Sequence, residues 1–238
     1  MPEHPVRRRG LGTKGWFRPA RGVARLLAMA TRTERLELRP FAPDDGAGIF
    51  GYLADPEAVR FEPYGVPTRE ECDALAADRA HDERFVAVCL RDGTLIGNLY
   101  RSVEGPPTWR TWEIGYVFGP RFWGHGYATE AAARLVRDLF EVEGAHRVVA
   151  ACDVRNERSW RLLERLGMRR EAHMLQAATF ADDEHGRPVW HDSYHYAILE
   201  ARDDAPTTTS PTHHFSDVID RVEHEHERVT VTRNGRPR

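Results

Sequence analysis

Residues 121–128 read Arg-Phe-Trp-Gly-His-Gly-Tyr-Ala, and an apolar stripe at helical spacing follows them from Ala128 to Phe140. The N-terminal end of a helix carries about half a positive charge and several N–H groups without a partner, so it binds phosphate groups. Gly124 and Gly126 lack side chains that would keep a phosphate away from the backbone. The stretch therefore predicts a phosphate site at the start of a helix. The alternative is an ordinary strand–helix turn that needs two glycines.

Strand and helix patterns continue toward the N-terminus. Four segments have strand patterns: 35–39, 85–90, 95–100 and 111–118. Asp44 and Asp45 are expected to open a short helix, and Thr68-x-x-Glu71 is a capping box that starts a second one. Asp92-Gly93 predicts a tight hairpin in which both central residues have positive φ.

Predicted strands and helices also alternate on the C-terminal side of the turn. The nearly continuous apolar run over 147–152 is typical of a buried central strand. Asn156 is expected to cap a helix, and two long strands are expected over 168–180 and 188–200. This order of elements predicts an α/β fold with a mixed, mostly antiparallel sheet and helices on both faces.

Composition limits the class of protein. The chain has 238 residues and a formal net charge of −3, and no apolar run approaches the ~20 residues that would span a membrane. Its three cysteines include no Cys-x-x-Cys pair, so we expect reduced thiols in a cytoplasmic protein and no zinc site. His224-Glu-His226 offers two ligands without convergent partners, so no metal is expected.

Three segments differ in composition. The globular domain is expected over 31–203. Residues 1–30 carry seven basic residues against one acid and are expected to be a disordered extension. They could be a nucleic-acid-binding arm or a targeting segment, or translation could begin at Met29. Residues 204–238 begin as a linker rich in proline and threonine.

The turn and its flanks resemble the GNAT superfamily of N-acetyltransferases, especially its RimJ/RimL-like branch. Arg121, Gly124 and Gly126 match the signature Arg/Gln-x-x-Gly-x-Gly/Ala. Further matches follow in collinear order within about 32–202: Glu113-Ile-Gly-Tyr116, Asn156-x-x-Ser159, Leu163-Glu-x-Leu-Gly-Met-Arg169 and Trp190-x-Asp192-x-x-x-Tyr196. The resemblance implies a GNAT fold and transfer of acetyl from acetyl-CoA to a primary amine, by direct attack in a ternary complex.

The same resemblance implies which residues hold the cofactor. Backbone amides of the turn would bind the pyrophosphate of acetyl-CoA, and Asn156 would lie beside the pantetheine arm. The residues implied are Arg121, Phe122, Trp123, Gly124, His125, Gly126, Tyr127, Ala128 and Asn156.

Acetyl transfer to an amine needs a base for the amine, donors for the oxyanion and an acid for the thiolate. A thioester is already activated, so no cysteine nucleophile is required. Glu113 is the expected base, because family members often place a carboxylate there. Asp192 is a second candidate, with a role in holding the site together as the alternative. Ser159 is the candidate acid unless it only caps its helix.

Histidines near these motifs could also act as bases, because they titrate near neutrality. They are His125, His173, His191 and His195. Since the chain has twelve histidines, structural or surface roles are the simpler interpretation for each.

The C-terminal tail resembles the start of a Phd/YefM-type antitoxin. Apolar residues at 215, 218, 219 and 222 have helical spacing, and a strand-like segment then leads to Asn-Gly-Arg-Pro. The sequence stops at Arg238, before most of such a domain, so we expect neither DNA binding nor an intact fold from it. A coincidental amphipathic helix is the alternative.

The acceptor is the least defined part. By resemblance it is a protein N-terminal α-amine, with a small metabolite, an antibiotic or an aminoacyl-tRNA amine as alternatives. A non-catalytic acyl-CoA-binding protein or a DNA-binding regulator is the alternative from another class. No basic stripe lies within 32–202, which weighs against nucleic acid for the main domain. No membrane partner is expected, and the oligomeric state, a homodimer included, stays open.

Overall fold

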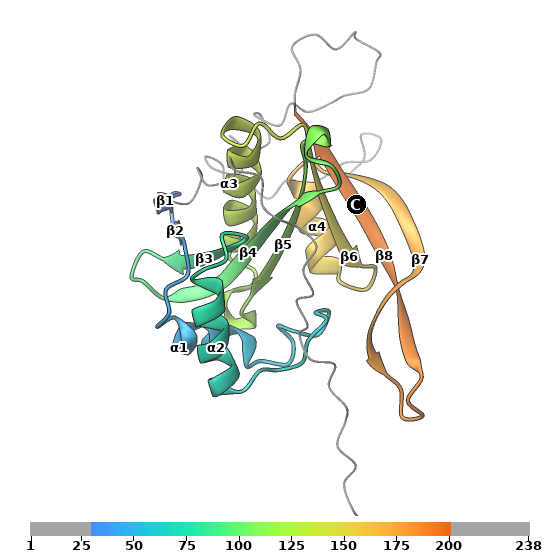
Figure 1. Cartoon of the computed structure of the whole chain (residues 1–238), viewed down its shortest axis with the longest axis horizontal. Helices are drawn as coiled ribbons and strands as arrows, with labels where there is room; N and C mark the ends of the chain where they lie inside the picture. Colours follow the sequence, from blue (N-terminus) through green and yellow to red (C-terminus); the bar gives the residue numbers. More distant parts are fainter. Residues whose placement is uncertain (1–29, 201–238) are drawn as a thin grey trace, which may run out of the picture.

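The computed structural model describes residues 30–200, which form one open sheet with helices against it (Figure 1). The strand order is β1-β2-β3-β4-β5-β6-β8-β7, and every neighbouring pair is antiparallel except β5 and β6. The strands are β1 (Thr31–Arg32), β2 (Leu36–Arg39), β3 (Phe85–Leu90), β4 (Leu95–Glu104), β5 (Thr111–Phe118), β6 (Arg147–Asp153), β7 (Arg169–Asp182) and β8 (Pro188–Leu199). The predicted α/β class with a mixed, mostly antiparallel sheet is therefore confirmed.

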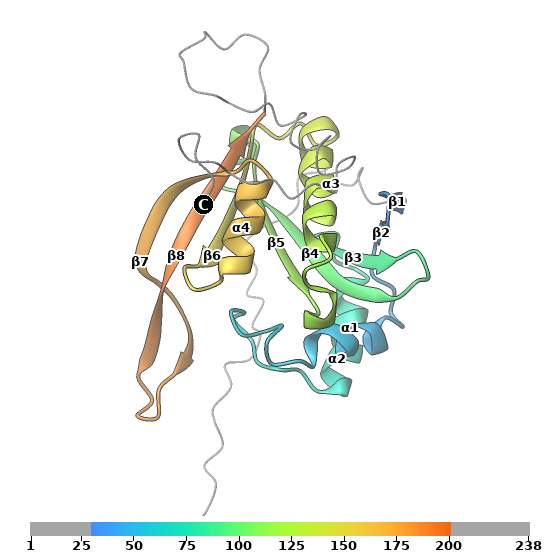
Figure 2. The same ribbon diagram turned by 180° about the vertical axis from the view of Figure 1, so that it is seen from behind.

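Helices cover both faces of the sheet. Helices α3 (Tyr127–Glu141) and α4 (Glu157–Arg165) lie on the face turned toward the viewer in Figure 2. Helices α1 (Gly46–Leu53) and α2 (Arg69–Arg79) lie on the other face. Each pair of helices buries its own apolar cluster against the sheet, and β3 serves both because its side chains alternate between the two faces.

Local capping signals explain where several helices begin. Thr68 accepts a hydrogen bond from the Glu71 amide while Glu71 accepts one from the Thr68 amide, so the predicted capping box is present. The predicted cap at Asn156 is also present. Asp45 precedes α1 without capping it, because its carboxylate instead binds the Arg39 guanidinium at 2.7 Å.

The hairpin between β3 and β4 differs from the sequence prediction. Its central residues are Arg91 and Asp92, and the Gly93 amide donates to the Leu90 carbonyl at 3.0 Å. Only Gly93 has positive φ, at 87°, and the Asp92 carboxylate accepts from the Thr94 amide. The prediction of two positive-φ residues in a two-residue turn is wrong, because the aspartate side chain stabilises a longer turn in which glycine follows the centre.

Strand β6 is not buried on both faces as its apolar pattern predicted. Val148 and Ala150 are buried under α3 and α4, whereas Ala151 is exposed and Val149 is half-buried. Helices α1 and α2 cover the β3–β4 side of their face and leave β6 and β8 uncovered (Figure 1). Within residues 30–200, no helix covers this face of β6 and β8.

Strands β5 and β6 separate near their middle. Their register covers three residue pairs and ends at Glu113 opposite Val149, although β5 continues to Phe118 and β6 to Asp153 (Figure 2). Backbone groups of β5 that point toward β6 lose their strand partner beyond Glu113. The sheet therefore opens at the level of the glycine-rich turn.

None of the helices within residues 30–200 has the length and apolarity that crossing a membrane would require. Residues 1–29 of the basic extension, the antitoxin-like tail and His224-Glu-His226 lie outside the described residues.

Candidate active site

The glycine-rich turn has the backbone shape that a phosphate site needs. Gly124 and Gly126 have φ of 79° and 80°, a left-handed conformation that other residues adopt at a cost. The first hydrogen bond of α3 runs from the Glu130 amide to the Gly126 carbonyl. The amides of Tyr127, Ala128 and Thr129 therefore have no partner within the helix and are free to bind an anion.

Residues from the far N-terminal side of the domain hold the turn in place. Glu130 is only 5% exposed, and its carboxylate accepts from the Thr33 hydroxyl at 2.5 Å and from the Arg35 amide at 2.9 Å. The Arg35 guanidinium binds the same carboxylate at 2.7 Å, donates to the His125 carbonyl at 2.8 Å and stacks over the Tyr127 ring. Arg35 therefore fixes both the turn and the first turn of α3.

We expect Arg35→Ala to weaken acetyl-CoA binding about tenfold, equivalent to roughly 1.4 kcal/mol. The variant would lose the hydrogen bond to the turn and leave the buried Glu130 carboxylate with fewer donors. Calorimetric titration with acetyl-CoA measures the effect. Arg32→Ala is the matched control, because its exposed ion pair with Glu37 lies on the same hairpin away from the turn. Equal affinities of the two variants would refute the role of Arg35.

Helix α4 presents a second N-terminal end close to the turn. Asn156 caps it by accepting from the Ser159 amide at 3.2 Å. The Tyr116 hydroxyl, from β5, lies 2.9 Å from the Ser159 hydroxyl oxygen and donates to the Ser159 carbonyl at 3.2 Å. Burial raises the pKa of Tyr116, so its hydroxyl stays protonated at neutral pH and serves as a donor.

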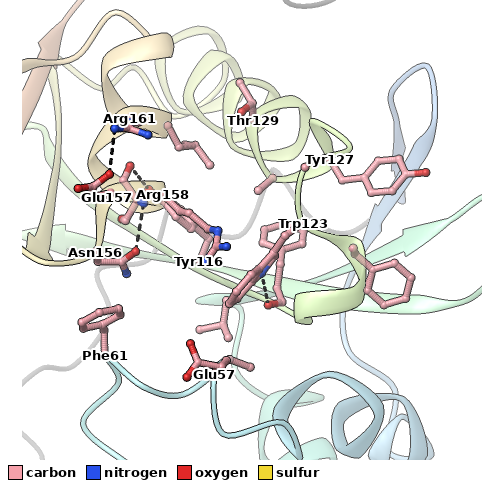
Figure 3. A pocket seen from close by; sticks show the side chains of 18 of the residues that line it. Glu57, Phe61, Tyr116, Trp123, Tyr127, Thr129, Asn156, Glu157, Arg158 and Arg161 are labelled. Atoms are coloured by element: carbon pink, nitrogen blue, oxygen red, sulfur yellow. Dashed lines mark hydrogen bonds and ion pairs between the residues drawn. The ribbon is translucent and has the colours of Figure 1, made fainter.

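A cavity of about 840 Å³ lies between the turn, α4 and the loop that follows α1 (Figure 3). Its floor is the free end of β5, over residues 116–118. Its walls are the turn at 122–129, residues 155–165 and residues 57–62. The N-terminal ends of α3 and α4 thus open into one cavity, where β5 and β6 part.

Arginine side chains of α4 add positive charge to the cavity wall. Arg158, Arg161 and Arg165 all line it, at the spacing of one helix face. Arg161 pairs with Glu157 at 2.9 Å, and Arg158 stacks over the Trp123 ring. Arg158 and Arg165 have no ion-pair partner within residues 30–200. These arginines were not predicted from the sequence, although their spacing indicates that they share one face of a helix.

Most of the residues implied for the cofactor meet at this cavity. Those that line it are Phe122, Trp123, Gly124, Gly126, Tyr127, Ala128 and Asn156. The other two are not among the lining residues. Arg121 stacks on the Phe122 ring, and the His125 ring stacks on Tyr127 with its Nδ1 2.9 Å from the Trp123 carbonyl. His125 can still contribute through the backbone of the turn.

The three candidate catalytic residues fall in different places. Ser159 lines the cavity. Glu113 is the last β5 residue paired with β6, and strand alternation directs its side chain to the face opposite Tyr116. Burial raises the pKa of Glu113, but the residue does not line the cavity. The Asp192 carboxylate accepts from His173 Nε2 at 3.0 Å and from the Gln176 amide at 2.9 Å, which fixes irregular pairing in β7.

The remaining candidate histidines and the three cysteines do not line the cavity. His191 lies 3.7 Å from Asp153 and hydrogen-bonds Arg155, and His195 is exposed on β8. Burial raises the pKa of all three thiols, to about 11 for Cys152, so they remain neutral at neutral pH. This supports a reaction without a cysteine nucleophile.

A family model described as an acetyltransferase (GNAT) domain matches residues 35–169. The chain belongs to the GNAT acetyltransferase family. Among curated proteins it is similar to the uncharacterized N-acetyltransferase YnaD of Bacillus subtilis, with 32% identity over 175 residues that cover 72% of this chain and 98% of YnaD. It is also similar to the FsC-acetyl coenzyme A-N(2)-transacetylase of Aspergillus fumigatus, with 30% identity over 129 residues that cover 49% of this chain and 55% of that protein.

Solved structures agree with the sequence relatives. A GNAT family acetyltransferase from Bacillus anthracis aligns with a TM-score of 0.64 and 31% identity, covering 72% of this chain and 98% of that one. The protein is thus an acetyltransferase with the GNAT fold, and enzymes of this family use acetyl-CoA.

Proposed function

We propose that this GNAT acetyltransferase transfers acetyl from acetyl-CoA to a primary amine by direct attack in a ternary complex. The observation that carries the proposal is the convergence of two helix N-terminal ends on one cavity, at the point where β5 and β6 part. The turn and the arginines of α4 provide the positive potential that the phosphates of coenzyme A require. The pantetheine arm then runs past Asn156 into the gap between the strands.

The residues around that gap supply the chemistry of the thioester. N–H groups of β5 directed toward β6 have no strand partner beyond Glu113 and can donate to the oxyanion. Tyr116, whose hydroxyl lies 2.9 Å from that of Ser159, protonates the leaving thiolate. Ser159 then acts with Tyr116 as one donor pair. The amine itself needs a base, for which Glu113 and the cavity carboxylates are candidates.

The acceptor class follows from charge on the loop wall of the cavity. Glu57, Glu62 and Arg60 lie there, so carboxylates outnumber cations on this wall and attract an ammonium group before it loses its proton. This supports an amine acceptor. Within that class we propose a protein N-terminal α-amine, as in RimJ/RimL-like enzymes, on the strength of the sequence resemblance.

The experiment incubates the full chain with acetyl-CoA and a panel of N-terminal peptides, polyamines, amino sugars and aminoacyl-tRNA, and follows thiol release. Turnover with peptides supports the proposed acceptor, and turnover only with small amines or aminoacyl-tRNA replaces it with the alternative. Acetyl-CoA binding without turnover on any amine would instead indicate a non-catalytic acyl-CoA-binding protein. Sequence-specific retention of DNA would indicate a regulator.

We expect Tyr116→Phe to lower kcat by about 10²-fold, because general acid assistance to a leaving group typically contributes this much. The KM for acetyl-CoA should stay within about twofold, since the ring and its packing remain. Steady-state kinetics at saturating acceptor measure both constants. An unchanged kcat in Tyr116→Phe would exclude Tyr116 as the proton donor. If kcat falls only in Ser159→Ala, Ser159 is the proton donor.

A further inference from the structure

The loop from α1 to α2 closes the cavity on the side away from α3 (Figure 3). Two carboxylates lie on this wall, and they differ in their surroundings. Glu57 is more than half exposed and pairs with Arg60 at 3.5 Å. Glu62 is half-buried and has no ion-pair partner within 4 Å among the described residues. Of the two carboxylates on this wall, Glu62 is therefore the one without an ion pair among the described residues.

A cluster of polar groups acts on Glu62 from behind the wall. Tyr64 and Arg79 of α2 both favour the charged form of its carboxylate and so oppose the rise in its pKa. The Arg79 guanidinium is itself fixed, because it donates to the Tyr52 hydroxyl at 3.0 Å and to the Asn98 side-chain oxygen at 3.3 Å. It is only 7% exposed, and the Phe85 ring stacks against it.

This cluster connects the acceptor wall to the floor of the cavity. Asn98 on β4 pairs with Val117 on β5, and Val117 lines the cavity beside Tyr116. Glu62 on the loop wall and the Tyr116–Ser159 pair at the floor and the α4 wall thus line the same cavity. A proton acceptor and a proton donor on two sides of one cavity suit acyl transfer from a thioester to an amine.

We propose that the carboxylate of Glu62 accepts the proton that the acceptor amine loses as it attacks the acetyl thioester. This inference rests on the proposed function and names a base for it. The nitrogen lone pair forms a bond to the carbonyl carbon, and the C–S bond breaks with its electron pair on sulfur. The amine proton passes to Glu62, and the thiolate takes a proton from Tyr116. Exchange with water then resets both groups.

The titration of Glu62 agrees with this role. Burial raises its pKa to about 7, against the smaller opposing effects of Tyr64 and Arg79. Across the cavity it faces the charged groups of residues 155–165, of which Arg155 contacts the neighbouring Phe61 ring. A base with a pKa near the working pH combines a large deprotonated fraction with useful basicity. Glu113 also has a raised pKa but does not line the cavity.

The test measures kcat/KM against pH for the full-length protein and an acceptor that it acetylates. For the wild type we expect kcat/KM to rise through an ionisation near pH 7, as Glu62 loses its proton. Glu62→Gln should lower the plateau about 10²-fold and remove this ionisation, leaving only that of the acceptor amine. Glu113→Gln should retain the ionisation near pH 7.

Tyr64→Phe gives an independent readout, because the variant keeps the base but removes the hydroxyl that stabilises its charged form. The ionisation should then shift to higher pH with activity recovered above it. Calorimetric titration of each variant with acetyl-CoA, together with its circular dichroism, shows that the fold and cofactor site remain.

Two results would overturn the assignment of Glu62: an unchanged pH profile in Glu62→Gln, or loss of the ionisation in Glu113→Gln instead. Failure of the proposed function is recognisable separately, because the wild type would then acetylate no amine although it binds acetyl-CoA.

Discussion

Gly126→Glu is expected to abolish acetyl-CoA binding, with a loss in affinity of more than about 10²-fold, or roughly 3 kcal/mol. Residue 126 has φ of 80°, and a side chain in this conformation costs about 1–2 kcal/mol. Its Cβ would lie 3.3 Å from the Arg35 guanidinium that holds the turn. The new carboxylate would place a negative charge beside the phosphates that the N-terminal end of α3 attracts. Calorimetric titration with acetyl-CoA measures the loss.

Gly144→Glu is the matched control, at the other end of the same helix. Gly144 also has positive φ, at 63°, and no atom lies within 4 Å of a Cβ built there. This variant therefore adds the same side chain and a similar backbone strain far from the cavity. It should bind acetyl-CoA like the wild type. A comparable loss in both variants would mean that Gly126 acts on folding and not on the cofactor.

Glu143→Ala is expected to destabilise the fold by about 3–5 kcal/mol, because it leaves a buried guanidinium without its partner. Arg101 on β4 is 2% exposed and donates to the Glu143 carboxylate at 3.0 Å, and its guanidinium also lies over the Trp112 ring. This pair joins the centre of the sheet to the segment after α3. Urea-induced unfolding, followed by circular dichroism, measures the change in the free energy of unfolding.

Arg69→Ala serves as the comparison for an exposed pair. Arg69 and Asp73 lie 3.3 Å apart on the surface of α2, with about half of each side chain exposed. Loss of this ion pair should lower the free energy of unfolding by less than about 1 kcal/mol. Similar costs for the two variants would show that burial does not set the contribution of the Arg101–Glu143 pair.

The sequence predicted the elements whose signals are local. The capping box at Thr68, the cap at Asn156 and the stripe of α3 each depend on residues within a few positions of one another. The glycine-rich turn could be placed for the same reason, since a strand precedes it and a helix follows it. Its left-handed backbone at Gly124 and Gly126 agrees with the residue type.

Features that depend on distant contacts could not be predicted. Arg35 lies 95 residues before Glu130, and nothing in either neighbourhood indicates that they meet. The pairing of Tyr116 with Ser159 and the cluster behind Glu62 likewise require the folded sheet. The hairpin at 91–94 was predicted wrongly because the sequence does not show which residues occupy the centre of the turn. Ala151 is exposed although its neighbours in the sequence are apolar. Only the positions of the helices show that they leave one face of β6 uncovered.

We propose that acetyl-CoA bound in the cavity at the N-terminal ends of α3 and α4 donates its acetyl group to an amine. The most direct test supplies the full chain with acetyl-CoA labelled by carbon-13 in its acetyl group, together with a cell lysate, and locates the label by mass spectrometry. We expect labelled amides at primary amines with the wild type and none with Gly126→Glu. Equal labelling by both proteins, or no labelled amide from a wild type that binds acetyl-CoA, would contradict it.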